Sequence, residues 1–208
     1  MSAAYPWPAY LLAGGRSRRL GEDKARARLD DETTVLQAAM QPLGGLFLSW
    51  TALAAEEGAY DDLGVPTLGD ETPDRGPLGG ILRAAIDCEE EYFFVMSCDR
   101  LGVRREWVER LAERLNGHPA AVTFEDRGRR EPLFGFYRAD LVGELRGFME
   151  GNHGAVWRFL ETVDGATIPA PPGWEDCFSV NDPGDLQRAR KWWRSKMGDA
   201  ELTSRGCD

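Results

Sequence analysis

A short apolar stretch, residues 9–12, runs directly into a double glycine, and a dense group of basic side chains follows. The apolar stretch predicts a β-strand. Gly14 and Gly15 then allow the backbone to turn with its N–H groups pointing outward. Residues 16–28 contain six basic side chains against two acidic ones, although the whole chain carries a net charge of −10. A glycine turn surrounded by cations in an acidic chain predicts a polyanionic ligand, most simply a nucleoside triphosphate.

The alternative for this segment is an ordinary glycine turn followed by a solvated basic helix face. The spacing of the full run, from Leu12 to Lys24, is more specific than that alternative requires. It matches neither the Walker phosphate loop nor the GxGxxG dinucleotide fingerprint, because both have different spacings. The segment therefore predicts a phosphate-binding loop of another kind.

Composition limits the remaining function classes. The chain has 208 residues, of which 42% are hydrophobic, and its pI is about 4.8, so a sizeable core is expected and nonspecific nucleic-acid binding is disfavoured. No apolar run approaches the roughly 20 residues of a membrane helix, and the first ten residues do not resemble a signal peptide. We therefore expect a cytoplasmic protein that binds neither nucleic acid nor membrane. Its cysteines lack a CxxC spacing and its two histidines are isolated, so a zinc site is not indicated.

Apolar runs alternate with helical patterns along the whole chain, which is typical of an α/β fold. We expect a single domain over residues 1–208, with an ordered core at about 9–197 and a polar, frayed tail at 198–208. The predicted class is a three-layer sandwich around a mostly parallel central sheet. The strands are expected at 9–12, 46–50, 65–68, 92–96, 120–124 and 132–137. The helices are expected from the Thr34 cap to Pro42, at 78–87, 104–116, 139–150 and 156–161, and onward from Asp182.

Ligands of such sheets bind beyond the carboxyl ends of the strands, where three further segments are expected to meet the glycine loop. Asp70 follows one strand, and its carboxylate can accept from the adjacent N1–H and N2–H₂ donors of guanine; it can equally be a turn residue. Asp99 follows a strongly apolar strand and either caps a turn or ligates Mg²⁺. Gly79 lies in a helix start of little side-chain bulk, and Asn181 precedes a well-capped helix.

These motifs carry a resemblance to a known family. The run LAGG-x-S-x-R-x-G-x-D-K, the GPL-x-G segment at 76–80, the strand-C-D segment at Asp99 and the N-x-P-x-D-L segment at Asn181 are similar to those of the molybdenum cofactor nucleotidyltransferases, specifically the MobA-type guanylyltransferases. The resemblance covers roughly residues 10–193. It implies a Rossmann-like nucleotidyltransferase fold.

The resemblance also implies an activity, in which GMP passes from GTP to molybdopterin with release of pyrophosphate. It assigns nucleotide binding to Leu12, Ala13, Gly14, Gly15, Arg19, Lys24, Asp70 and Asp99. Arg19, Lys24 and Asp99 would be catalytic, with Asp99 holding Mg²⁺. Gly79 would contact the acceptor, and Asn181 would reach either the metal or the pterin-bearing acceptor. Arg127, Arg129 and Arg130 would either hold the acceptor phosphate or form a solvated hairpin tip. A molybdoenzyme or its chaperone would receive the product.

Two positions depart from the family pattern. Leu101 stands where the family usually has proline, and Ser49 lies where an asparagine would help to hold the nucleotide. The Ser49 hydroxyl would be a weak replacement for that asparagine, since one hydroxyl offers less than an amide. These departures leave two alternatives open. One is a cytidylyltransferase acting on molybdopterin or another phosphorylated acceptor, and the other is a nucleotide-binding accessory protein without turnover.

Overall fold

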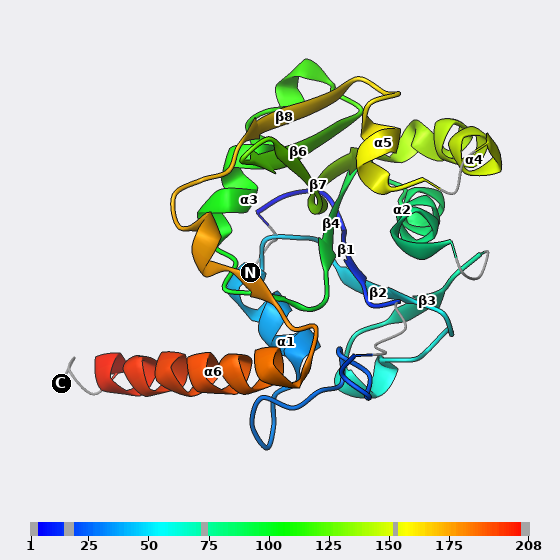
Figure 1. Ribbon diagram of the computed structural model, residues 1–208. Helices are drawn as coiled ribbons and strands as arrows, with labels where there is room; N and C mark the ends of the chain where they lie inside the picture. The colour runs from blue at the N-terminus through cyan, green and yellow to red at the C-terminus, as the bar shows by residue number, and fades with distance from the viewer. Residues whose placement is uncertain (1–3, 15–18, 72–74, 152–153, 205–208) are drawn as a thin grey trace.

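A computed structural model of the chain describes residues 4–14, 19–71, 75–151 and 154–204. Its centre is a seven-stranded sheet with the strand order β3-β2-β1-β4-β7-β6-β8 (Figure 1). The strands of this sheet are β1 (Ala9–Leu12), β2 (Trp50–Ala54), β3 (Thr67–Gly69), β4 (Tyr92–Ser97), β6 (Ala121–Asp126), β7 (Arg129–Arg138) and β8 (Gly165–Pro169). Only β7 runs antiparallel to its neighbours, so the predicted mostly parallel sheet is confirmed.

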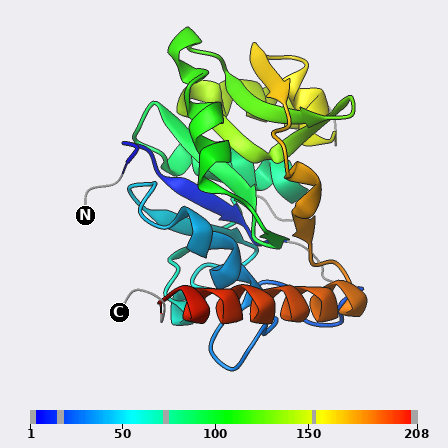
Figure 2. The same cartoon turned by 90° about the vertical axis from the view of Figure 1, so that its left-hand side faces the viewer.

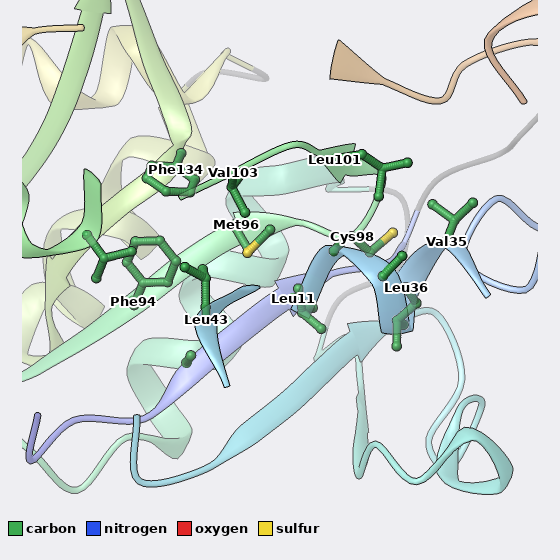
Figure 3. Packing of buried hydrophobic residues seen from close by; sticks show 14 of the residues in the cluster. Leu11, Val35, Leu36, Leu43, Phe94, Met96, Cys98, Leu101, Val103 and Phe134 are labelled. Carbon is green, nitrogen blue, oxygen red and sulfur yellow. The ribbon is translucent and has the colours of Figure 1, made fainter. Parts of the chain in front are cut away.

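Helices cover both faces of this sheet and complete the predicted three-layer sandwich (Figures 1 and 2). One face carries α1 (Val35–Met40), α3 (Arg105–Ala112) and α6 (Pro183–Ser204), and the other carries α2 (Gly76–Asp87), α4 (Val142–Gly151) and α5 (Val156–Leu160). Two hydrophobic clusters correspond to the two interfaces between layers. Figure 3 shows part of the first, where Leu36 of α1 lies beside Leu11 and Cys98. No helix in the described part of the chain is long and apolar enough to cross a membrane.

Capping side chains explain where two of these helices begin. Thr34 caps α1 through the predicted capping box, in which its hydroxyl accepts from the Gln37 backbone N–H while the Gln37 side chain accepts from the Thr34 N–H. Asp182 likewise accepts from the Asp185 N–H at 2.9 Å at the start of α6. Helix α6 continues to Ser204, beyond Met197 where the ordered core was predicted to end, and the fraying of the tail stays a prediction.

Some short elements have no counterpart in the sequence prediction. The small two-stranded sheet formed by β5 (Arg100–Leu101) and β9 (Phe178–Ser179) was missed, as was β8. The strand expected at 46–50 was also misplaced, because β2 begins only at Trp50. Leu46 and Phe47 are buried in a loop instead, where the Phe47 ring stacks on Phe94 with centroids 5.0 Å apart.

Candidate functional site

The sheet changes direction of growth between β1 and β4. The chain adds β2 and β3 on one side of β1 and then returns through α2 to place β4 on the other side. Such a switch point leaves a crevice beyond the carboxyl ends of the two central strands, where α/β proteins bind ligands. Here the Leu12 carbonyl accepts from the Cys98 N–H at 3.2 Å, which holds the two strand ends together.

Three polar side chains from distant parts of the sequence meet at this switch point. The Lys24 ammonium lies 3.2 Å from Oδ2 of Asp99 and donates to Oδ1 of Asn181 at 2.7 Å. Asp99 is only 8% exposed, and the Lys24 side chain is 23% exposed. The structure therefore brings together three of the residues that the sequence singled out, as a cluster of one cation and two oxygen donors.

The carboxylate of Asp99 is held in place from two directions. Ser97, at the end of β4, donates its hydroxyl hydrogen bond to Oδ1 of Asp99. Behind it, β5 pairs with β9, and the Asp99 carbonyl accepts from the Val180 N–H at 3.1 Å. This pairing is what carries Asn181 to the Asp99 loop. Ser97 was not predicted, although alternate residues of an extended chain point the same way and Ser97 lies two positions before Asp99.

The backbone around Lys24 is anchored by its neighbour Asp23. One Asp23 oxygen accepts from the Ala25 N–H at 2.9 Å, and the other accepts from the Tyr60 hydroxyl at 2.9 Å. Burial and the hydrogen bond to Asp23 raise the pKa of Tyr60, which keeps its hydroxyl protonated as a donor. Tyr60 was also missed by the sequence analysis, because nothing local links it to residue 23. The Tyr60 hydroxyl also lies 3.4 Å from the Ala13 carbonyl, so the pair links the segment around Lys24 to the glycine loop.

The glycine loop differs from the sequence expectation. The amides predicted to point outward are engaged within the protein, because the N–H groups of Ala13 and Gly14 both donate to the Leu53 carbonyl, at 2.9 and 3.0 Å. An amide already bonded to a neighbouring strand is not a free phosphate donor, so the prediction was wrong for Gly14. Gly15, with Arg16 and Arg18, lies outside the described residues. Arg19 is exposed in the turn that follows them.

Asp70 lies on the same edge of the sheet but away from the switch point. It follows β3, and its N–H donates to the Ala54 carbonyl at 2.8 Å. Neighbouring strands are about 4.8 Å apart, so the ends of β3 and β4, three positions apart, are separated by roughly 14 Å. Burial raises the pKa of the Asp70 carboxyl. Asp70 and Asp99 thus lie at separate positions along one sheet edge rather than in a single cluster.

The glycines of α2 serve close packing. Gly79 and Gly80 are both buried in the first turns of the helix. A Cβ atom added to Gly80 would overlap Cδ2 of Leu12, so the Leu12 side chain of β1 packs directly on the helix at Gly80 and would have to move. A contact between Gly79 and an acceptor remains a prediction.

The two departures from the family pattern have different outcomes. The carbonyl of Ser49 accepts from the Ala9 N–H at the amino end of β1, so Ser49 lies at the opposite edge of the sheet from the crevice. Its assignment as a replacement for the nucleotide-binding asparagine was therefore wrong, and followed from the misplaced strand. Leu101 is fully buried and pairs with Phe178 in the small sheet, which accommodates the absence of proline.

The basic hairpin lies at the end of β6 and β7. The strands continue further than predicted, with Asp126 opposite Arg129 and Glu125 opposite Arg130, so the turn shortens to Arg127 and Gly128. Because β7 is antiparallel to β4, this turn projects from the same sheet edge that carries Asp99. Arg127 and Arg129 are exposed, which is compatible both with binding of the acceptor phosphate and with a solvated hairpin tip.

Comparisons with known proteins agree with this architecture. Residues 9–167 match the model of the MobA-like NTP transferase domain. The chain is 26% identical over 197 residues to the molybdenum cofactor guanylyltransferase of Syntrophotalea carbinolica, covering 91% of this chain and 92% of the relative. It is 29% identical to the protein of the same name from Rhizobium rhizogenes, covering 89% and 91%.

A solved structure shows the same fold. Molybdopterin-guanine dinucleotide biosynthesis protein A from Archaeoglobus fulgidus superposes with a TM-score of 0.73 at 21% identity, covering 90% of this chain and 99% of that protein. At this identity the likeness speaks for the fold alone. The family assignment comes from the domain match, which spans most of the sequence: the chain belongs to the MobA-like NTP transferase family.

Proposed function

We propose that this protein is a guanylyltransferase that moves GMP from GTP to molybdopterin, giving molybdopterin guanine dinucleotide and pyrophosphate. The observation that carries the proposal is the contact of Lys24 with Asp99 and Asn181 at the switch point of the sheet. A cation and a carboxylate held together beside a nucleotide crevice are what phosphoryl chemistry requires. The relatives that cover most of the chain bear the name of this activity.

The donor set of the site fits Mg²⁺. The oxygens of Asp99 and Asn181 already surround one cation, the Lys24 ammonium, and both are the hard oxygen donors that Mg²⁺ prefers. The described residues contain no cluster of three or more His, Cys, Asp or Glu side chains. That is compatible with Mg²⁺, which is commonly held by one or two carboxylates together with substrate phosphates and water. Bound there, the ion would neutralise charge on the triphosphate.

The side chains divide the binding of the nucleotide between them. Lys24 and Arg19 supply positive charge for the triphosphate and for the pyrophosphate that leaves. Asp70, roughly 14 Å along the edge, accepts from N1–H and N2–H₂ of guanine, a donor pair that cytosine lacks. The backbone from Leu12 to Gly14 would hold the base and the sugar-phosphate between them. Asn181 and the α2 start at Gly79 face the acceptor side.

The reaction needs little from a general base. The terminal phosphate of the acceptor is already an anion near neutral pH, since its second pKa is about 6. One of its oxygens forms a bond to the α-phosphorus of GTP, while the bond from that phosphorus to the bridging oxygen of pyrophosphate breaks. Catalysis therefore rests on alignment and on charge neutralisation by Lys24 and Arg19. We place the reaction in the cytoplasm, with a molybdoenzyme or its chaperone as recipient of the product.

Equilibrium binding of GTP and CTP in the presence of Mg²⁺, followed by pyrophosphate release on addition of molybdopterin, tests the proposal. We expect GTP to bind at least about tenfold more tightly than CTP, a difference of about 1.4 kcal/mol, and pyrophosphate to appear only with acceptor. Tighter binding of CTP would move the protein to the cytidylyltransferases. Binding of GTP without pyrophosphate release would indicate an accessory protein.

A further inference from the structure

Helix α6 has two unlike faces. Leu186, Ala189 and Trp193 are buried in the first hydrophobic cluster and anchor the helix, with the Trp193 indole donating to Asp30. The helix runs along one side of the molecule beside α1 in both views (Figures 1 and 2). Its outward surface has exposed cations along its length, which we call the α6 cationic face: Arg188, Arg190, Lys191, Arg194 and Lys196.

The α6 cationic face contrasts with the rest of this acidic protein. Residues 183–198 contain five basic side chains and one acidic one, whereas the whole chain has a net charge of −10. Some arginines elsewhere in the chain are paired with carboxylates, as in Arg26–Asp62 at 2.7 Å and Arg146–Glu71 at 3.1 Å. In the described part of the chain, none of the five cations of the α6 face forms an ion pair. Their charge is therefore left for something outside the chain.

Two of these cations are held in place by aromatic rings. The Arg188 guanidinium lies 4.3 Å from the centre of the Phe178 ring, and the Lys196 ammonium lies 5.1 Å from that of Trp192. The two rings in turn meet edge to face at 5.9 Å. Cations fixed on aromatic faces lose less side-chain entropy when they bind an anion. The half-buried rings also add apolar surface beside the charge.

The shape of the face favours an extended acidic ligand. A hollow of about 580 Å³ is lined by Gly184, Gln187, Arg188, Arg190, Lys191 and Arg194. From residue 188 to residue 194 the cations that line this hollow extend over roughly 9 Å of helix, which is longer than a single phosphate group. Nucleic acid fits poorly, because the remaining surface of the chain is strongly acidic and repels a long polyanion. An acidic stretch of another protein contacts only the face itself.

We propose that the α6 cationic face is a docking surface for a partner protein that presents a short acidic segment. The surface is separate from the nucleotide crevice, although α6 begins two residues after Asn181. Such charge complementarity would set the orientation and speed of association. The inference depends on the exposed residues of α6 and not on the reaction proposed for the crevice.

Binding of a fluorescent poly-L-glutamate peptide, followed by anisotropy at physiological ionic strength, tests this surface. The test variant is Arg188→Glu with Lys191→Glu. The matched control is Arg110→Glu with Arg114→Glu, which makes the same change of charge at exposed positions of and after α3. A neutralising variant, Arg188→Gln with Lys191→Gln, shows whether any loss follows charge. Thermal melting of each variant confirms that it is folded.

We expect the α6 reversal to weaken peptide binding by about tenfold or more, the neutralising variant by less, and the α3 control by under about twofold. Equal weakening by both reversals would overturn the proposal, since it would show an effect of net charge alone. Tighter binding of a single-stranded oligonucleotide or of phosphatidylserine vesicles than of poly-L-glutamate would also overturn it, in favour of a different class of partner. Failure of the native protein to bind the peptide would have the same consequence.

Discussion

Asp99 and Asp70 each follow a parallel strand at the same edge of one sheet, yet their surroundings are opposite. Asp99 receives a hydrogen bond from Ser97 and lies against the Lys24 ammonium. Asp70 is partly buried, and the described part of the chain places no donor on its carboxylate. Burial without a partner is what raises the pKa of Asp70.

The difference in surroundings indicates what Asp99 and Asp70 each bind. At Asp99 the protein supplies its own cation, the Lys24 ammonium, so the charge of the carboxylate is balanced before any ligand arrives. A ligand that binds Asp99 must therefore bring positive charge or take the place of the Lys24 ammonium. At Asp70 the donors are missing, so the complementary ligand is one that brings N–H groups of its own. Mg²⁺ with a triphosphate fits the first description, and the Watson–Crick edge of guanine fits the second.

Asp99→Asn should have the largest effect. The amide keeps the shape of the side chain but removes the charge that would hold the metal, so we expect pyrophosphate release to fall by about 10³-fold. Binding of Mn²⁺ measured by electron paramagnetic resonance should weaken in parallel. Asp140→Asn, at the exposed amino edge, is the control and should change neither quantity. Retained Mn²⁺ binding in Asp99→Asn would show that the metal site does not depend on the Asp99 carboxylate.

Lys24→Met sharpens the comparison, because it should act in opposite directions on two measurements. Loss of the ammonium removes charge from the triphosphate site, and we expect kcat/KM for GTP to fall by about 100-fold. In the absence of nucleotide, however, Lys24 competes with a metal for the same Asp99 oxygen. Mn²⁺ should therefore bind the nucleotide-free variant severalfold more tightly than the native protein. Weaker Mn²⁺ binding would contradict the exchange and assign Lys24 a purely structural role.

Only part of the contrast between the two carboxylates could be predicted from the sequence. An apolar strand followed by a polar residue is a local pattern, so the positions of Asp70 and Asp99 at the sheet edge could be predicted. The partners of these two carboxylates could not be predicted. Lys24 meets Asn181 across 157 positions of sequence, and that contact depends on the pairing of the two-residue strands β5 and β9. Strands so short leave no periodicity to detect.

The wrong predictions have a common physical cause, which is that packing overrides local pattern. Leu46 and Phe47 are as apolar as strand residues, but they fill an aromatic cluster from a loop. The backbone at Gly14 is as free to turn as at any glycine, but its N–H donates a hydrogen bond to the Leu53 carbonyl. In both cases the deciding neighbour comes from another strand and is invisible in a local window.

Asp70→Asn tests the guanine end with a smaller effect. The amide can donate where the carboxylate only accepts, so it no longer matches two adjacent donors. We expect the preference for GTP over CTP to fall by about tenfold, with CTP binding unchanged. Isothermal titration with each nucleotide measures this, and Asp62→Asn, a surface residue, is the control. An unchanged preference would show that Asp70 is a turn residue and that the base is read elsewhere.

The smallest effect should be on stability, and its dependence on pH has a definite sign. Because burial raises the pKa of Asp70 in the folded state above its unfolded value, the folded protein holds this proton more firmly. The ionised carboxylate therefore destabilises the fold above that pKa, and the cost disappears as the pH falls through it. Asp70→Asn should melt roughly 1 °C higher than the native protein at neutral pH. As the pH falls from the folded pKa to below the unfolded pKa of the carboxyl, the two melting temperatures should converge. A difference that grows on acidification would mean that the Asp70 carboxylate is stabilised by a donor after all, and the contrast with Asp99 would be lost.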